Sequence, residues 1–151
     1  MNMKYALRSE DTEQITVINW TQYQINAHPE LALLHHCPNG GSRNKVEAIK
    51  LKQMGVLAGV PDLHLPVPKG IYSGLYIEMK YGDGRLQTSQ KDFLKTAAGH
   101  GNFCVVCYTA EEAIQIIQEY VNLKPIDTGA GENRMKIDNT SILCRGKVKR
   151  L

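Results

Sequence analysis

The stretch that decides the fold spans residues 58–80 and reads AGVPDLHLPVPKGIYSGLYIEMK. Two runs within it, LHLPV and GLYIEMK, alternate apolar and polar residues with the period of two that half-buried strands show. The segment PKGIYSG between them is rich in glycine and proline, which is typical of a turn. The sequence therefore predicts two neighbouring strands joined by a connection of nine residues or fewer.

The same alternation places the ionisable residues of the two strands. In GLYIEMK the leucine, isoleucine and methionine share one face, so Glu78 and Lys80 project side by side from the other face. Pairing of Leu65 with Leu75 would bring Asp62 opposite Glu78. Two acids and a lysine at the end of a sheet predict a site for a divalent cation. The alternative is a structural ion pair between Glu78 and Lys80 on a solvated strand face.

The chemistry of such a site would suit a phosphodiester. Mg²⁺ prefers carboxylate oxygens and water, and it usually takes one or two protein carboxylates. Near a phosphodiester it stabilises the developing charge and lowers the pKa of a water molecule. Lys80 would orient that water or neutralise the transition state. The acid-x-lysine triplet is weak support by itself, because about one such triplet arises by chance in a chain of this composition.

The rest of the chain predicts helices and further strands around this pair. Four helices are predicted, with N-caps at Ser9, Ser42, Ser89 and Thr109. The first runs to about Ala27 and the second stops at Gly55. Apolar runs predict strands at 31–37 and 102–108. Helices that alternate with strands in this way predict an α/β domain with a small mixed β-sheet flanked by helices.

Length and composition are those of one globular domain, with 151 residues of which 42% are hydrophobic. No apolar run is long enough to span a membrane, and the N-terminus lacks a secretory signal. We therefore expect no membrane partner and a cytoplasmic location, in a bacterium or in the host of a phage. Cys104 and Cys107 form the single CxxC pair, but positions three apart in a strand face opposite ways, which favours core cysteines over zinc ligands.

Positive charge is concentrated at the C-terminal end. Residues 1–123 carry 11 basic and 12 acidic side chains, whereas residues 124–151 carry 7 basic and 3 acidic ones. We treat the second segment as a basic C-terminal tail outside the main domain. It is either a solvated terminus or an arm that contacts phosphates.

The order of short blocks along the chain carries a resemblance to a known family. Pro-Asp at 61–62 followed by Glu-Met-Lys at 78–80 resembles the PD-(D/E)xK nuclease superfamily. The blocks SEDTEQ, HCPNGGSR, LKQMG, AGVPDLHLP, GLYIEMK and GRLQTSQKDFL, in that order, are similar to the virus-type replication-repair nuclease domain, VRR-NUC. This resemblance covers about residues 9–122, and we assign 1–123 to the nuclease domain.

The resemblance implies a restriction-endonuclease-like core and Mg²⁺- or Mn²⁺-dependent cleavage of branched or flapped DNA. Asp62 and Glu78 would be metal ligands and Lys80 the catalytic lysine. Glu10 or Glu13 would complete the metal site, and the pattern Glu-x-x-x-Gln at residues 10–14 favours Glu10. The family glutamine that opens the helix after the catalytic strand corresponds to Gln90, which is a predicted catalytic residue that would contact the scissile region or a metal-bound water; the alternative is a solvated residue of the first helical turn. His36 matches a family position before the turn at 38–41.

Expected partners follow from the turn and from the relatives. Backbone N–H groups of PNGG at the start of a helix can hold a phosphate, so Asn39 and Arg43 are predicted DNA contacts. Stand-alone domains of this kind resemble phage and bacterial Holliday-junction resolvases, which implies a homodimer with two active sites. The alternatives are a non-catalytic DNA-binding module and a sequence-specific restriction-type endonuclease.

Overall fold

The computed structural model describes residues 7–38, 44–128 and 131–151. Over these residues six strands form one sheet in the order β1-β2-β3-β4-β5-β6. The strands are β1 His35–His36, β2 Leu63–Leu65, β3 Leu75–Met79, β4 Phe103–Cys107, β5 Thr140–Cys144 and β6 Lys147–Arg150. The α-helices are α1 Glu10–Gln24, α2 Lys45–Gln53, α3 Thr88–Gly99 and α4 Ala110–Val121, and the short 3-10 helices are η2 Pro29–Leu33 and η3 Ile126–Thr128. β3 runs parallel to β4 and β4 to β5, whereas the other neighbours are antiparallel. The expected mixed sheet with flanking helices is confirmed.

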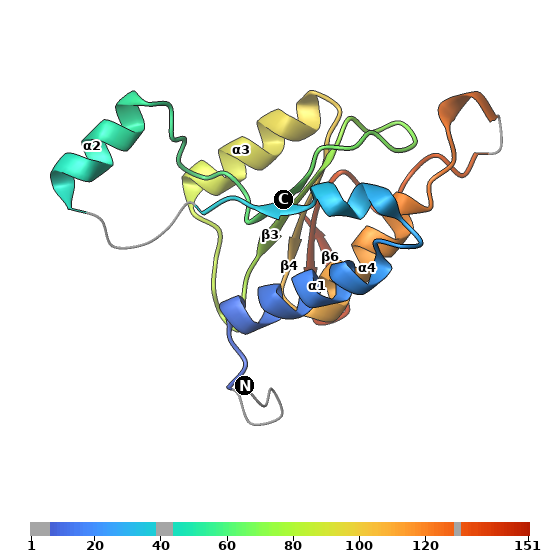
Figure 1. Ribbon diagram of the computed structural model, residues 1–151, viewed down its shortest axis with the longest axis horizontal. Coiled ribbons are helices and arrows are strands. Elements are labelled where there is room, and N and C mark those ends of the chain that lie inside the picture. Colours follow the sequence, from blue (N-terminus) through green and yellow to red (C-terminus); the bar gives the residue numbers. More distant parts are fainter. Residues whose placement is uncertain (1–6, 39–43, 129–130) are drawn as a thin grey trace.

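Two hydrophobic clusters cover the two faces of this sheet. α1 and α4 pack on one face, over a cluster that includes Leu75, Ile77 and Met79 of β3. α3 packs on the opposite face, over a smaller cluster that Tyr76 joins. Figure 1 shows α3 on one side of the strands and α1 with α4 on the other, whereas α2 lies apart from the sheet. The alternation predicted for β3 is therefore confirmed.

The register of β2 and β3 is also the predicted one. Leu65 pairs with Leu75 and Leu63 with Ile77, so Asp62 comes next to Glu78 at the end of the ladder. β2 begins at Leu63, and the carboxylate of the preceding residue, Asp62, accepts a hydrogen bond from the Met79 N–H at 2.8 Å. The Asp62 side chain thus takes the place of a backbone partner for the Met79 N–H.

The helix starts agree with the prediction at two of four places. Ser9 caps α1 and Thr109 caps α4. Ser42 lies outside the described residues, and the side chain of Asn44 accepts from the N–H of the third residue of α2. The N-cap prediction for Ser89 was wrong, because α3 begins at Thr88 and Ser89 lies inside the helix. Gln87 is its N-cap, and the Gln90 side chain accepts from the Gln87 N–H at 2.9 Å.

The strand predicted at 31–37 is mostly wrong. Pro29 opens a 3-10 turn, since its fixed φ suits a first helical position, and Leu31 fills the core from that turn. Only His35–His36 pairs with β2.

The segment predicted as a tail contains two strands of the sheet. β5 pairs with β4 through Val105 and Ser141, and β6 returns along β5. The turn between them uses Arg145 and Gly146, both with positive φ, the conformation that two-residue hairpins require. The sheet thus continues beyond residue 123. Among the described residues, no helix is long and apolar enough to cross a membrane.

Candidate metal centre and active site

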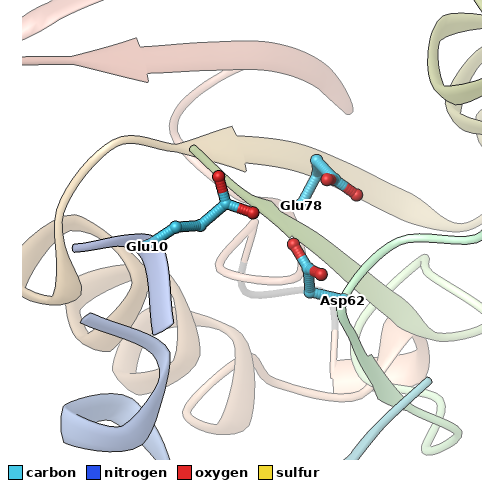
Figure 2. A group of neighbouring side chains, drawn as sticks. All are labelled: Glu10, Asp62 and Glu78. Carbon is cyan, nitrogen blue, oxygen red and sulfur yellow. The ribbon is translucent and has the colours of Figure 1, made fainter. Parts of the chain in front are cut away.

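Three carboxylates from distant parts of the chain meet at the end of β3. One oxygen each of Glu10, Asp62 and Glu78 lies within 4.8 Å of the others. Figure 2 shows the side chains coming from α1, from the segment before β2 and from β3. The Lys80 Nζ lies 3.6 Å from Oε1 of Glu78. The predicted grouping of Asp62, Glu78 and Lys80 is therefore present, with Glu10 as the third acid.

Asp62 is fixed from several sides. Its carboxylate accepts from the Met79 N–H, and its carbonyl accepts from the Cys37 N–H at 2.9 Å and lies 2.7 Å from Nδ1 of His36. His36 in β1 and Cys37 directly after it thus hold the loop that carries the Asp62 carboxylate. Such backbone contacts limit the positions that Asp62 can adopt.

The two candidate acids of α1 have different surroundings. Ser9 and Thr12 form a capping box, with the Ser9 N–H donating to Thr12 Oγ1 at 2.8 Å. This cap places Glu10 in the first helical turn, facing Asp62 and Glu78.

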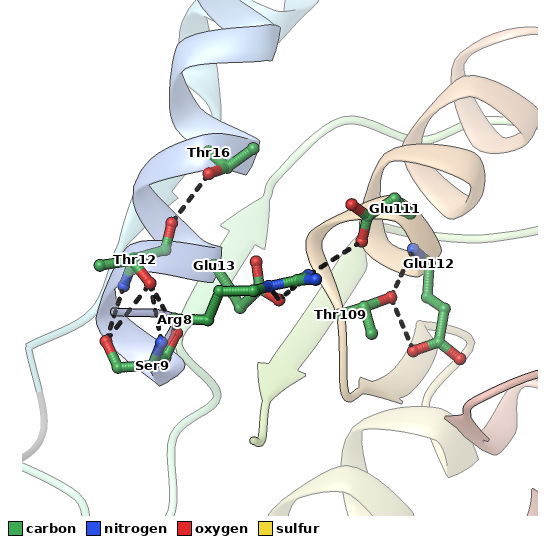
Figure 3. A network of polar contacts seen from close by, with 8 residues as sticks. All are labelled: Arg8, Ser9, Thr12, Glu13, Thr16, Thr109, Glu111 and Glu112. Atoms are coloured by element: carbon green, nitrogen blue, oxygen red, sulfur yellow. Dashed lines mark hydrogen bonds and ion pairs between the residues drawn. The ribbon is translucent and has the colours of Figure 1, made fainter. Parts of the chain in front are cut away.

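Glu13 is only 4% exposed and points elsewhere. Nε of Arg8 donates to Glu13 Oε1 at 3.0 Å, and Nη2 of Arg8 lies 3.5 Å from Glu111 at the start of α4. Figure 3 shows this network linking the two helix starts. Glu13 is therefore part of the contact between α1 and α4, and Glu10 is the acid that joins the cluster.

Glu78 carries the strongest electrostatic perturbation. It is 2% exposed, and burial with the nearby Asp62 charge raises its pKa to about 8, although Lys80 acts in the opposite direction. Burial and the Asp62 charge also raise the pKa of Glu10, again against Lys80. The negative charges outnumber the single ammonium, so the cluster favours an added cation.

The two oxygens of Glu78 are treated differently. Oε1 accepts from Nε2 of Gln90 at 3.1 Å and faces Lys80. Oε2 is buried and has no hydrogen-bond partner among the described residues. A buried carboxylate oxygen without a donor is costly, and a cation beside it would remove that cost. The donor set and this oxygen fit a hard divalent cation.

A cavity of about 510 Å³ opens over the cluster. Besides the three acids and Gln90, its walls include Gln14 and His36, two positions that the family pattern singled out. Asn39 and Arg43, the predicted DNA contacts, lie outside the described residues.

Two residues that shape the site were not identified from the sequence. Gly59 has φ +87°, and a Cβ there would lie 2.3 Å from the Ser89 carbonyl oxygen, so only glycine lets this loop approach α3. Gly59 lies two residues before Pro61, and this glycine was a usable signal. Arg8 gave none, because its contact with Glu111 joins residues far apart in the chain.

Comparison with known proteins agrees with this geometry. None of the curated proteins matches the chain. A solved structure described as a VRR_NUC domain protein is 33% identical, with a TM-score of 0.71, and the match covers 86% of this chain and 99% of that one. The family model of the VRR-NUC domain matches residues 3–111, which include the three acids, Lys80 and Gln90. The chain belongs to the VRR-NUC nuclease domain family.

Proposed function

We propose that this protein is a divalent-metal-dependent, structure-specific endonuclease that hydrolyses phosphodiesters in branched DNA, such as four-way junctions or flaps. The observation that carries the proposal is the buried, unpartnered Oε2 of Glu78 within a group of three carboxylates next to Lys80. A structural ion pair between Glu78 and Lys80 would need neither Glu10 nor Asp62. Membership of a nuclease family supports the same conclusion.

Glu10, Asp62 and Glu78 would hold Mg²⁺ or Mn²⁺ through their carboxylate oxygens. The bound ion supplies Lewis-acid stabilisation of the phosphoryl charge and a water molecule of lowered pKa. Gln90 holds Oε1 of Glu78, which leaves Oε2 for the ion. The three acids would thus position the ion, and Gln90 would position Glu78; the surrounding hydrogen bonds support these roles.

Lys80 would act on the reacting groups themselves. Lys80 is only 8% exposed, so its charge acts in a poorly solvated place. There it would orient the attacking water or neutralise the negative charge that develops on the phosphoryl oxygens. The water oxygen forms a bond to phosphorus, the bond to one ester oxygen breaks, and that oxygen takes a proton to leave as a hydroxyl. The products are a phosphomonoester and a free hydroxyl end.

The proposal includes a preference for branched DNA and a homodimeric state. A junction must be cut on two strands, and a two-fold dimer presents two equal sites. Asn39 and Arg43 are proposed to contact the DNA backbone. The basic residues that follow Cys144 would contact more distant phosphates.

Cleavage of labelled DNA tests the proposal. Wild type and Lys80→Met, which keeps the length of the side chain, are incubated with four-way junction, 5′ flap and linear duplex DNA in Mg²⁺, Mn²⁺ or EDTA. We expect metal-dependent cutting of the branched DNAs that Lys80→Met loses by at least about 100-fold. Tight binding without cutting in either metal would contradict the proposal and indicate a non-catalytic DNA-binding module. Equal cutting of linear duplex at one sequence would indicate a restriction-type enzyme.

A further inference from the structure

A second cavity, of about 640 Å³, lies beside the acidic one. The two share Ala58 and Ser89 as walls, so they are neighbours along the edge of α3. The lining of the second cavity is mostly apolar and includes Tyr76, Phe93 and Ala97. Its size lies in the range of cavities that bind small organic groups.

The spacing along β3 connects the two cavities. Tyr76 and Glu78 project from the same face of the strand, about 7 Å apart by the rise of two residues. The Tyr76 ring is held by stacking on His64 at 4.1 Å between centroids and by an edge contact with Phe93 at 5.2 Å. A group that enters the second cavity is therefore about one nucleotide away from a phosphodiester at the acids.

The charge of this cavity favours a base over a phosphate. Among the described residues that line it, the ionisable one besides Tyr76 is Asp92, whose exposed carboxylate would repel a phosphate. Ser89, Thr96 and Asn102 add hydroxyl and amide groups at its walls. Aromatic and apolar walls with a few hydrogen-bonding groups are the usual surroundings of a nucleobase removed from its stack.

We propose that the cavity lined by Tyr76, Phe93 and Ala97 receives one unstacked nucleobase of the strand whose phosphodiester lies at Glu10, Asp62 and Glu78. This inference rests on the proposed nuclease function and specifies its substrate further. Bases next to a branch point are already partly unstacked, so their entry costs less free energy than removal from a continuous duplex. The cavity would in this way make the enzyme prefer branched DNA.

If the cavity receives a base, filling the cavity and removing that base should have the same effect on cleavage. Ala97→Phe and Thr96→Trp add bulk at two places in the wall, and Gln115→Phe and Gln115→Trp make matched changes at an exposed position of α4, on the other side of the sheet. Each variant is tested on the preferred branched DNA and on a set of the same DNAs with one abasic residue at successive positions near the cut. Cleavage rates in Mg²⁺ and Kd in EDTA are measured, and circular dichroism checks folding.

The expected result is a single nucleotide position at which base removal and cavity filling each lower kcat/KM about tenfold, without a further loss when they are combined. The Gln115 variants should match wild type. Losses that multiply at every position, or filled variants that cut like wild type, would overturn the inference while leaving the nuclease proposal intact. A wild type that cuts no DNA would instead contradict the nuclease proposal. The Kd values of the same variants on the same abasic DNAs would then show whether the cavity binds a base. Dimer loss in the filled variants, without selectivity for any abasic position, would indicate that a second copy of the chain fills this cavity.

Discussion

The acidic end of β3 and the basic edge of the sheet use charge in opposite ways. At β3, Glu78 and Lys80 are almost completely buried, and a hydrogen-bonded frame holds the acids. At β6 every residue of Lys147–Arg150 is exposed, and Arg150 pairs with Asp138 at 2.9 Å on the surface. Buried charges interact strongly over a few ångströms, whereas exposed charges are screened and act on extended partners. The first region suits chemistry on one phosphate, and the second suits attraction of many.

The two regions are connected at the same end of the sheet. Nη2 of Arg145, in the turn between β5 and β6, lies 3.3 Å from the Gly82 carbonyl oxygen in the loop after Lys80. Arg85 and Lys149 line a cavity of about 340 Å³ at this place. A DNA strand at the acids would therefore reach these cations when it continues in that direction.

The largest difference between the regions should come from neutralising one acid in each. Asp62→Asn removes a proposed metal ligand, and cleavage in Mg²⁺ should fall by about 10³-fold. Asp83→Asn makes the same change of charge in the exposed loop near Arg145 and should leave the rate within about threefold of wild type. Single-turnover cleavage of the preferred branched DNA measures both. An Asp62→Asn variant as fast as Asp83→Asn would exclude the acidic cluster as the metal site.

A sharper comparison lies within α1, where two acids are one turn apart. Glu10→Gln should lower cleavage by about 100-fold, because Glu10 faces the other two acids. Glu13→Gln should keep most of the activity but lower Tm by about 3 °C, because Arg8 loses its buried partner. Cleavage assays and thermal unfolding of both variants separate the two roles. The reverse pattern would assign the metal to Glu13.

The basic edge should affect binding and its salt dependence more than the chemical step. Replacing Lys147 and Lys149 with glutamine should weaken binding about tenfold and reduce the slope of log K against log salt by about 2. The matched pair Lys124→Gln with Lys136→Gln changes the same charge at exposed positions outside β5 and β6. Equal slopes for the two pairs would contradict a role of this edge. Deletion of 124–151 would be a poor test, since it removes two strands of the sheet.

The sequence predicted the acidic region well because its signals are local. Alternation over 75–80 determined the faces of β3, and the short connection determined its register with β2. The partnership of Glu10 with Asp62 and Glu78 depended on the family pattern, because nothing near Glu13 indicates that Arg8 and Glu111 would surround it.

The basic edge was predicted poorly because its structure depends on distant partners. β5 pairs in parallel with β4 across the whole of α4, and its strand signal, TSILC, is brief and lies beside a strongly charged run. The charges were visible in the sequence, but β6, which carries them, pairs with β5, and β5 in turn is stabilised by pairing with residues 36 positions earlier in β4. Net charge indicates a partner and says nothing about fold.

The last prediction concerns the stability of the metal-free protein and how it depends on the titration of the buried Glu78. Because the pKa of Glu78 is raised to about 8 in the folded state, unfolding releases its proton between pH 5 and 8. The free energy of unfolding of the metal-free protein should therefore fall as pH rises through this range and level off above pH 8. In EDTA, Tm of wild type should drop by about 5 °C relative to Glu78→Gln between pH 5 and 8.5. Mg²⁺ should restore Tm of wild type at pH 8.5 and leave Glu78→Gln nearly unchanged, because a ligand that binds only the folded state stabilises it. Differential scanning calorimetry measures both proteins in EDTA at the two pH values and in Mg²⁺ at pH 8.5, and a wild type whose Tm follows that of Glu78→Gln across the range would show that burial leaves this carboxyl unperturbed.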